Sequence, residues 1–307
     1  MVITGTSGFI GGNLARALVA RGDEVIGVDR ITLIGVPWQQ VQLDLADRSA
    51  ANRMAKVAEG ADAVFHLAAL PGVRMTAPDI ARRRHRDIVV AAQTVVKAID
   101  PSVHLVATSS SSVYGGSSVN GAATQAPRAG KTRACREGDP LSPIGGYAQS
   151  KAAMEQLLAG RGRTAIARPF TVMGEGQRPD MAVALWLNAI TTGQPLTIFG
   201  STQRTRDFTD VRVVVAGLMA MADQQATGVF NLGAGQPRTL ADLIAAIEVV
   251  THRTARVRVV AADQQEVAHT FADTTRLQRD LGIDPSTDIS VILRRIVQQS
   301  AVAERVA

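Results

Sequence analysis

The sequence predicts an α/β protein with a doubly wound parallel sheet and a smaller lobe at its carboxyl-terminal end. Short apolar runs alternate with helix-like segments through the first half of the chain, which is typical of a parallel sheet covered by helices on both faces. A ladder of glycines follows the first apolar run, and after Pro169 turns rich in glycine and proline interrupt shorter elements. We therefore expect a sheet domain over residues 1–168 and a substrate lobe over 169–307, with some later segments returning to the sheet.

The glycine ladder belongs to the first strand-turn-helix unit. Residues 1–4 are typical of a buried strand and residues 9–19 of an amphipathic helix, with Gly5, Gly8 and Gly11 at the turn. Glycines here permit a tight turn and close approach of the backbone to a pyrophosphate, and the helix amino terminus offers free N–H groups. The spacing differs from G-x-G-x-x-G, but the order of elements predicts a dinucleotide site.

An acidic residue ends the second predicted strand, residues 24–28. Asp29 lies roughly 20 residues beyond the glycines, where a carboxylate binds the ribose diol of a dinucleotide. The same carboxylate would repel a 2′-phosphate, so NAD is favoured over NADP. Arg30 beside it weakens that inference slightly.

The other predicted elements of the first half continue the alternation. The expected strands are 41–43, 63–66, 103–108 and 164–167, and the expected helices are 50–59, 80–99 and 146–159. A serine run, residues 109–112, follows the strand 103–108, at the end of a sheet strand where ligands bind in such folds. Residues 115–143, rich in Gly, Ser, Pro and Arg, are predicted to form a long active-site loop.

Tyr147 and Lys151 are four positions apart at the start of a predicted helix, so their side chains share one face. A lysine ammonium near a phenol favours phenolate, and we expect it to lower the tyrosine pKa from about 10. Such a tyrosine could take a proton from a sugar hydroxyl while the carbon gives hydride to a nicotinamide. Tyr-x-x-x-Lys alone is a common helix pattern; its weight comes from the glycine turn and the serine run.

Composition limits the other classes of function. The 307 residues include 46% hydrophobic residues and carry a net charge of +6, with only residues 82–86 forming a basic cluster. We interpret that cluster as a solvated helix face and expect no nucleic-acid partner. The longest apolar run, 213–222, is too short to span a bilayer. Cys135, the only cysteine, excludes an intrachain disulfide and indicates a cytoplasmic protein; no metal site is expected.

Taken together, these motifs resemble the extended short-chain dehydrogenases/reductases, within them the NAD-dependent nucleotide-sugar epimerase/dehydratase family. The resemblance covers nearly the whole chain. It rests on TGTSGFIGG, Asp29, Asp44-Leu45, HLAA at 66–69, SSSSVYG, YAQSK, RPFTVMGEGQRPDM and RTRDFT. It implies a Rossmann-type sheet, tightly held NAD, and a homodimer formed through the helices at 80–99 and 146–159.

The resemblance also implies roles for single residues. Ser110, Tyr147 and Lys151 would be catalytic, Asp44 and Leu45 would contact the adenine, and Arg206 would meet the substrate diphosphate. The remaining cofactor contacts would come from Gly5, Gly8, Phe9, Ile10, Gly11, Asp29, Arg30, Leu67, Ala68 and Ala69. The remaining substrate contacts would come from Arg74, Ser111, Ser112, Thr171, Arg178, Phe199 beside the nucleotide base and Glu266 on its ribose.

The residues after Ser110 narrow the subgroup. The 4,6-dehydratases carry Asp-Glu there and the nucleotide-glucuronate decarboxylases keep the glutamate, whereas this chain has Ser111 and Ser112. SSSSVYG, GVR at 72–74 and FTVxGxxQRPDMA at 170–182 instead resemble the UDP-glucuronate 4-epimerases. Oxidation at carbon 4 of a hexuronic acid gives a β-keto acid that loses carbon dioxide readily. Arg178 and Thr171 match the positions that hold the carboxylate in that subgroup.

Several positions depart from the family pattern and leave alternatives open. Asp210 to Val213 replace the usual residues after RDFT, the late substrate loop contains Asp263 and Glu266, and Asp87 stands where an asparagine is usual. We expect NAD-dependent 4-epimerisation of UDP-glucuronate. The alternatives are a UDP-glucose 4-epimerase, decarboxylase, dehydratase or 4-ketoreductase on the same scaffold and, more remotely, a non-catalytic NAD-binding regulator.

Overall fold

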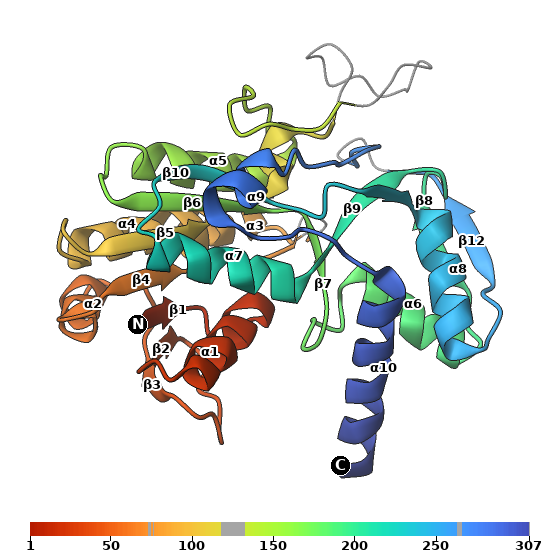
Figure 1. The fold of residues 1–307 in the computed structure, drawn as a ribbon, viewed down its shortest axis with the longest axis horizontal. Helices are drawn as coiled ribbons and strands as arrows, with labels where there is room; N and C mark the ends of the chain where they lie inside the picture. Colours follow the sequence, from red (N-terminus) through yellow and green to blue (C-terminus); the bar gives the residue numbers. More distant parts are fainter. Residues whose placement is uncertain (73–74, 76, 118–132, 263–265, 307) are drawn as a thin grey trace.

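The computed structural model describes residues 1–72, 75, 77–117, 133–262 and 266–306 (Figure 1). Arg74 and most of the predicted loop 115–143 therefore lie outside the described residues. Two lobes are visible: a sheet with helices on both faces, and a smaller group of strands and helices beside it (Figure 1).

The larger lobe is built on a sheet of seven strands in the order β10-β6-β5-β4-β1-β2-β3, and all six pairings between neighbours are parallel. The order runs outward from β1 in both directions, which confirms the predicted doubly wound fold. The strands are β1 (Val2–Thr4), β2 (Ile26–Asp29), β3 (Gln39–Gln42), β4 (Ala63–His66), β5 (His104–Thr108), β6 (Thr164–Pro169) and β10 (Gly228–Leu232).

Helices cover both faces of this sheet. One face carries α1 (Phe9–Arg21), α7 (Val211–Asp223) and α9 (Thr275–Leu281); the other carries α2 (Ala50–Ala58), α4 (Ala91–Ala98) and α5 (Gly145–Leu158). Each face has its own buried core: Leu14, Leu18 and Leu218 lie in the first, and Met54 and Met154 in the second. The central strands β1, β4, β5 and β6 are buried along their whole length because helices cover both faces, whereas the edge strand β3 is partly exposed.

The single helix predicted over 80–99 is divided in three. α3 (Ile80–Arg84) leads into a π-helical turn, η1 (His85–Val90), and then into α4. The predicted helical stretch is confirmed from Ile80 to Ala98, but its central turn is a π helix, which the sequence did not indicate. A π turn widens the helix by one residue and is often found at functional sites.

The smaller lobe has a separate core made by Trp186, Leu187, Ile244 and Leu293. β7 and β11 flank β9 in one small sheet, and β8 pairs with β12 in another. Its elements are β7 (Thr171–Met173), α6 (Ala182–Thr191), β8 (Leu196–Phe199), β9 (Thr205–Asp210), β11 (Pro237–Thr239), α8 (Leu240–Thr251), β12 (Val257–Val260) and α10 (Ile289–Val306). Between β9 and β11 the chain returns to the larger lobe to form α7 and β10.

A buried polar network joins β6, β10 and α5 to η2 (Ser111–Tyr114). The Arg168 guanidinium donates to both carboxylate oxygens of Glu155, at 2.9 and 2.6 Å, and to the Tyr114 hydroxyl at 2.8 Å. That hydroxyl in turn donates to Oδ1 of Asn231 at 2.7 Å. Because each charge has a partner inside the protein, the network fixes β6 and β10 against α5.

Within the described part of the chain, no helix is both long and apolar enough to cross a membrane.

Candidate active site

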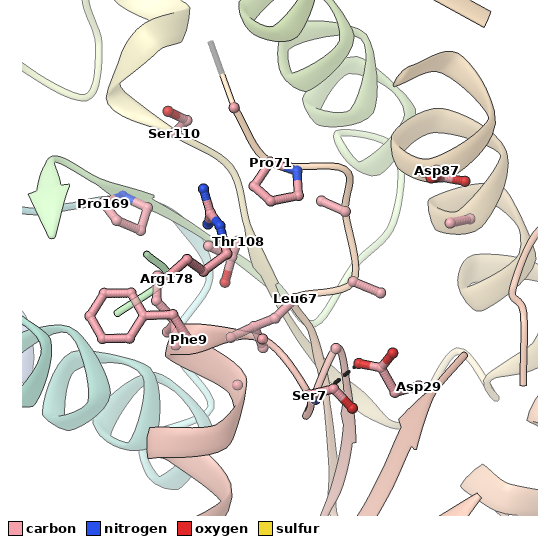
Figure 2. A pocket seen from close by; sticks show the side chains of 18 of the residues that line it. Ser7, Phe9, Asp29, Leu67, Pro71, Asp87, Thr108, Ser110, Pro169 and Arg178 are labelled. Carbon is pink, nitrogen blue, oxygen red and sulfur yellow. Dashed lines mark hydrogen bonds between the residues drawn. The ribbon is translucent and has the colours of Figure 1, made fainter. Parts of the chain in front are cut away.

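A cavity of about 540 Å³ lies at the carboxyl ends of the sheet strands (Figure 2). It is the place where doubly wound sheets bind ligands, beside the point at which the strand order reverses between β1 and β4. Most of the predicted site residues line it: Gly5, Gly8, Phe9, Ile10, Gly11, Asp29, Arg30, Asp44, Leu45, Leu67, Ala68, Ala69, Ser110, Tyr147, Lys151, Thr171 and Arg178.

The glycine turn leaves room for a phosphate at the start of α1. Gly5 has a φ of +85°, and a Cβ there would lie 2.7 Å from the Ala68 nitrogen. A Cβ on Gly11 would lie 2.1 Å from the Gly5 carbonyl oxygen, so α1 could not approach β1 this closely with a side chain there. The turn therefore presents bare backbone and a helix amino terminus to the cavity, which fits a dinucleotide pyrophosphate.

Two carboxylates mark the adenosine end of the cavity. Asp29 accepts hydrogen bonds from the backbone N–H of Ser7 at 3.0 Å (Figure 2) and from that of Ile31 at 3.1 Å. Asp44 accepts from the Ala46 N–H at 3.0 Å and from Arg86 at 2.6 Å. Held in this way at the ends of β2 and β3, both carboxylates are oriented before a ligand arrives.

The lysine of the predicted pair is buried. Lys151 is 3% exposed, and its ammonium donates to the backbone carbonyl of Thr108 at 2.7 Å. Burial lowers the pKa of Lys151 to about 8, with the charge of Glu155 acting in the opposite direction. His66 is the last residue of β4. Burial together with the charge of Lys151 lowers the pKa of His66 to about 3. His66 is therefore neutral at physiological pH.

The tyrosine differs from the sequence expectation. Burial raises the pKa of Tyr147, whereas we predicted a lowered one; Ser110, Arg178 and Arg84 oppose the rise. Lys151 is not among the groups that shift the pKa of Tyr147, and its ammonium donates to the Thr108 carbonyl. The positive charges that favour the phenolate come from arginines.

Ser110 is placed by the turn that follows β5. Its backbone is extended, and its hydroxyl oxygen accepts from the Ser112 N–H at 3.2 Å and from the Ser112 hydroxyl at 3.0 Å. This cap starts η2 and keeps the Ser110 hydroxyl at the cavity beside Tyr147. Ser111 and Ser112 do not line the cavity, although Ser112 orients Ser110.

Thr171, the first residue of β7, and Arg178 also line the cavity. Arg178 donates to the two oxygens of Asp180 at 2.9 and 3.3 Å, with 34% of its side chain exposed. The guanidinium is thus already bound as a fork to a carboxylate of the protein itself.

Three further predicted substrate residues, Arg206, Glu266 and Phe199, do not line the cavity. The Arg206 guanidinium donates to the carbonyl oxygens of Val267 at 2.9 Å and Ala268 at 3.2 Å, and it lies 3.7 Å from Glu266. Phe199, at the end of β8, is 37% exposed. Because Asp263 lies outside the described residues, as Arg74 does, the loop before Glu266 is only partly in view.

Two residues important to the site were not among the predicted ones. Thr108 supplies the carbonyl that holds Lys151, and any residue at the end of β5 can do this, so the sequence carries no signal for it. Asp87 lines the cavity from η1 and pairs with Arg30. The signal for Asp87 was its departure from the usual asparagine. No cluster of His, Cys, Asp or Glu that could bind a metal occurs among residues that the structure describes.

The parallel order 3-2-1-4-5-6, the glycine turn and the Ser110, Tyr147 and Lys151 group define an NAD-binding protein of the extended short-chain dehydrogenase/reductase class. The NAD dependent epimerase/dehydratase family matches residues 1–233, and the chain belongs to this family. The predicted family and the predicted cofactor, NAD, are confirmed.

Proteins similar to this chain indicate which kind of nucleotide-sugar enzyme it is. UDP-glucuronate 4-epimerase 2 of Arabidopsis thaliana is 30% identical over 97% of this chain and 75% of that protein. The structure of MoeE5 in complex with UDP-glucuronic acid and NAD is 30% identical, with a TM-score of 0.85 over 98% of this chain and 99% of that one. UDP-glucuronic acid 4-epimerase from Bacillus cereus, bound to UDP-glucuronic acid and NAD, is 25% identical, with a TM-score of 0.85 over 98% and 99%. The predicted enzyme class, an NAD-dependent nucleotide-sugar epimerase, is confirmed by these relatives.

Proposed function

We propose that this enzyme converts UDP-glucuronate to UDP-galacturonate by inverting carbon 4 through a transient 4-keto sugar. One observation of the structure carries the proposal: Arg178 and Thr171 line the same cavity as Ser110, Tyr147 and Lys151. A carboxylate-binding fork beside an acid/base tyrosine suits a uronic acid that is oxidised next to its carboxylate. The names of the similar proteins support the same substrate.

The proton steps belong to the chain's own side chains. Tyr147 accepts the proton of the 4-hydroxyl, and the Ser110 hydroxyl bridges the phenol and the sugar oxygen. The arginine charges around Tyr147 stabilise the phenolate. Bound NAD supplies the acceptor, and later the donor, of hydride at carbon 4. After the sugar turns, Tyr147 returns the proton to the oxygen, so the reaction needs no outside oxidant or reductant.

Lys151 acts as a positioning group in this proposal. Its ammonium, buried and held by the Thr108 carbonyl at 2.7 Å, has two further N–H donors for a ribose hydroxyl of the cofactor. A hydrogen bond from a buried ammonium to the ribose hydroxyl is strong because little water competes for the donor.

Arg178 and Thr171 hold the carboxylate during the keto stage. In the structure Asp180 takes the Arg178 fork, and 62% of its side chain is exposed. An exposed pair of this kind contributes about 0–1 kcal/mol, so a substrate carboxylate can replace Asp180 at small cost. Two parallel N–H···O bonds would then fix the orientation of the substrate carboxylate. In that orientation the carboxylate is not released as carbon dioxide from the 4-keto sugar.

The nucleotide half of the substrate is assigned to the smaller lobe. We place the base beside Phe199, the diphosphate at Arg206 and the uridine ribose at Glu266. The support is that Arg206 and Glu266 lie 3.7 Å apart. Arg74, Ser111 and Ser112 remain predicted substrate residues.

The first test is proton NMR of the enzyme with UDP-glucuronate and catalytic NAD. We expect a galacturonate anomeric signal. Release of a pentose would instead favour a decarboxylase, and turnover of UDP-glucose alone would favour the UDP-glucose 4-epimerase.

Arg178→Ala tests the carboxylate role directly. We expect a loss of turnover of about 10²-fold or more, or leakage of decarboxylated product, since about 3 kcal/mol of charge-assisted binding is removed. Arg212→Ala is the control, because Arg212 is exposed and does not line the cavity. Clean product at the original rate from Arg178→Ala would remove Arg178 from the mechanism.

We also propose that the enzyme is a cytoplasmic homodimer. The single cysteine, Cys135, supports a reducing compartment. α4 and α5 lie side by side on one face of the sheet, where a second copy could pack against them (Figure 1).

A further inference from the structure

We propose that Asp87 is a cofactor-specificity residue: by binding Arg30 it withholds that guanidinium from a 2′-phosphate and so enforces NAD over NADP. Asp87 and Arg30 both lie at the adenosine end of the cavity, and we assign neither of them a contact with the reacting atoms.

The contacts place this pair at the adenosine end of the cavity. Arg30 Nη1 donates to Oδ2 of Asp87 at 3.0 Å, and both residues line the cavity together with Asp29 (Figure 2 labels Asp29 and Asp87). Arg86 donates to Oδ1 of Asp87 at 2.7 Å and to Asp44 at 2.6 Å. A chain of ion pairs thus joins the ends of β2 and β3 to η1 across the part of the cavity that takes the adenosine ribose and base.

Burial decides which end of the Arg30–Asp87 pair is the fixed one. The Asp87 side chain is 9% exposed and each of its oxygens is bound by a different arginine, whereas the Arg30 side chain is 45% exposed. The π turn η1 carries Asp87 to the cavity. Arg30 is therefore the partner that is drawn toward Asp87.

The pairing of Arg30 with Asp87 matters because NADP differs from NAD by a 2′-phosphate. NADP carries a 2′-phosphate of about −1.5 to −2 charge, for which an arginine directly after the ribose-binding acid is a ready partner. An unpaired Arg30 would offset the repulsion from Asp29 and admit NADP. Bound to Asp87, Arg30 brings little net positive charge, and the repulsion from Asp29 remains.

The test measures bound nucleotide, not turnover. Each purified full-length variant is incubated to exchange equilibrium with equal concentrations of NAD and NADP and passed through gel filtration. The bound nucleotides are then extracted and quantified. Asp87→Asn keeps the side-chain shape and removes the charge, so we expect the ratio of bound NADP to NAD to rise at least about fivefold, as release of one partly buried ion pair allows.

Two further variants decide whether the effect passes through Arg30. In an Arg30→Met background, Asp87→Asn should change the ratio less than about twofold. Asp47→Asn removes the same charge at an exposed position that lies 3.7 Å from Arg86 and does not line the cavity, and it should leave the ratio unchanged. An unchanged ratio in Asp87→Asn, an equal rise in the Arg30→Met background, or an equal rise in Asp47→Asn would each overturn the proposal.

Discussion

The two tyrosines of this chain show how position separates a reactive group from a structural one. Burial raises the pKa of both Tyr114 and Tyr147. The Tyr114 hydroxyl accepts a hydrogen bond from Arg168 and donates one to Asn231, so both contacts are made within the protein. Only Tyr147 faces the cavity, so only its hydroxyl can exchange a proton with a ligand.

Exchanging each tyrosine for phenylalanine tests this difference. Tyr147→Phe should lower kcat by about 10²- to 10⁴-fold, the usual contribution of a general base, with an unchanged unfolding midpoint. Tyr114→Phe should instead lower the free energy of unfolding by about 1–2 kcal/mol, because a buried hydrogen bond is lost, and leave kcat within a few-fold. NMR turnover assays and thermal melts check both; a fully active Tyr147→Phe enzyme would contradict the mechanism.

The lowered pKa of Lys151 gives a pH dependence. As pH rises through about 8 the folded protein loses this ammonium, so kcat/KM should fall on the alkaline side near that pH. Lys151→Arg keeps the charge and should move the fall to higher pH; Lys56→Arg, exposed on α2, should not. An identical alkaline limb in Lys151→Arg would assign it to another group.

The same shift has a signed effect on stability. The folded pKa is below the ordinary value of 10.5, so below about pH 8 both states are protonated and burying the charge costs a constant free energy. Between about pH 8 and 10.5 only the folded state has released the proton. The contribution of Lys151 to stability therefore rises with pH in that window.

At the scale of elements, the local sequence predicted what depends on local chemistry. β4 lies at the predicted residues, and α1 begins at Phe9 as predicted. α1 continues to Arg21, two residues beyond the prediction, and ends at Gly22, whose φ of +99° caps the helix. The π turn η1 was missed because one inserted residue leaves the apolar pattern almost unchanged. Its consequence, the placement of Asp87, was missed with it.

The junction between β1 and α1 gives a prediction for a single methyl group. Gly11→Ala would place its Cβ 2.1 Å from the Gly5 oxygen, so α1 must shift and the phosphate site is lost. We expect the purified variant to contain less than about a tenth of the normal bound NAD, since a displaced backbone donor set forfeits more than about 1.4 kcal/mol. Gly162→Ala, whose Cβ meets no atom within 4 Å, should keep full occupancy. Full occupancy in Gly11→Ala would show that the turn tolerates the shift.

At the scale of the molecule, the order of the chain and its arrangement in space diverge. α7 and β10 belong to the sheet although they follow the smaller lobe's β9 in sequence. The sequence indicated that some later segments return, but an apolar run such as 213–222 is equally typical of either core. Which core it joins depends on partners far away in the chain.

Assembly gives the prediction at this scale. Light scattering should give twice 32.4 kDa, the mass of one chain. Ala153 lies on α5 between the exposed Gln149 and Gln156, so Ala153→Arg should yield the single-chain mass by placing like charges across the two-fold axis. Ala245→Arg, exposed on α8 in the smaller lobe, should remain a dimer. A dimer in Ala153→Arg would place the interface elsewhere.

The late return of β10 has a consequence for the nascent protein. β6 is synthesised well before residues 228–232, and its outer edge has no strand partner until those residues leave the ribosome. The whole smaller-lobe segment from β7 to β9 is translated in that interval. An unpaired strand edge is the surface on which chains aggregate. We therefore expect the nascent chain to be prone to aggregation while the segment from β7 to β10 is translated.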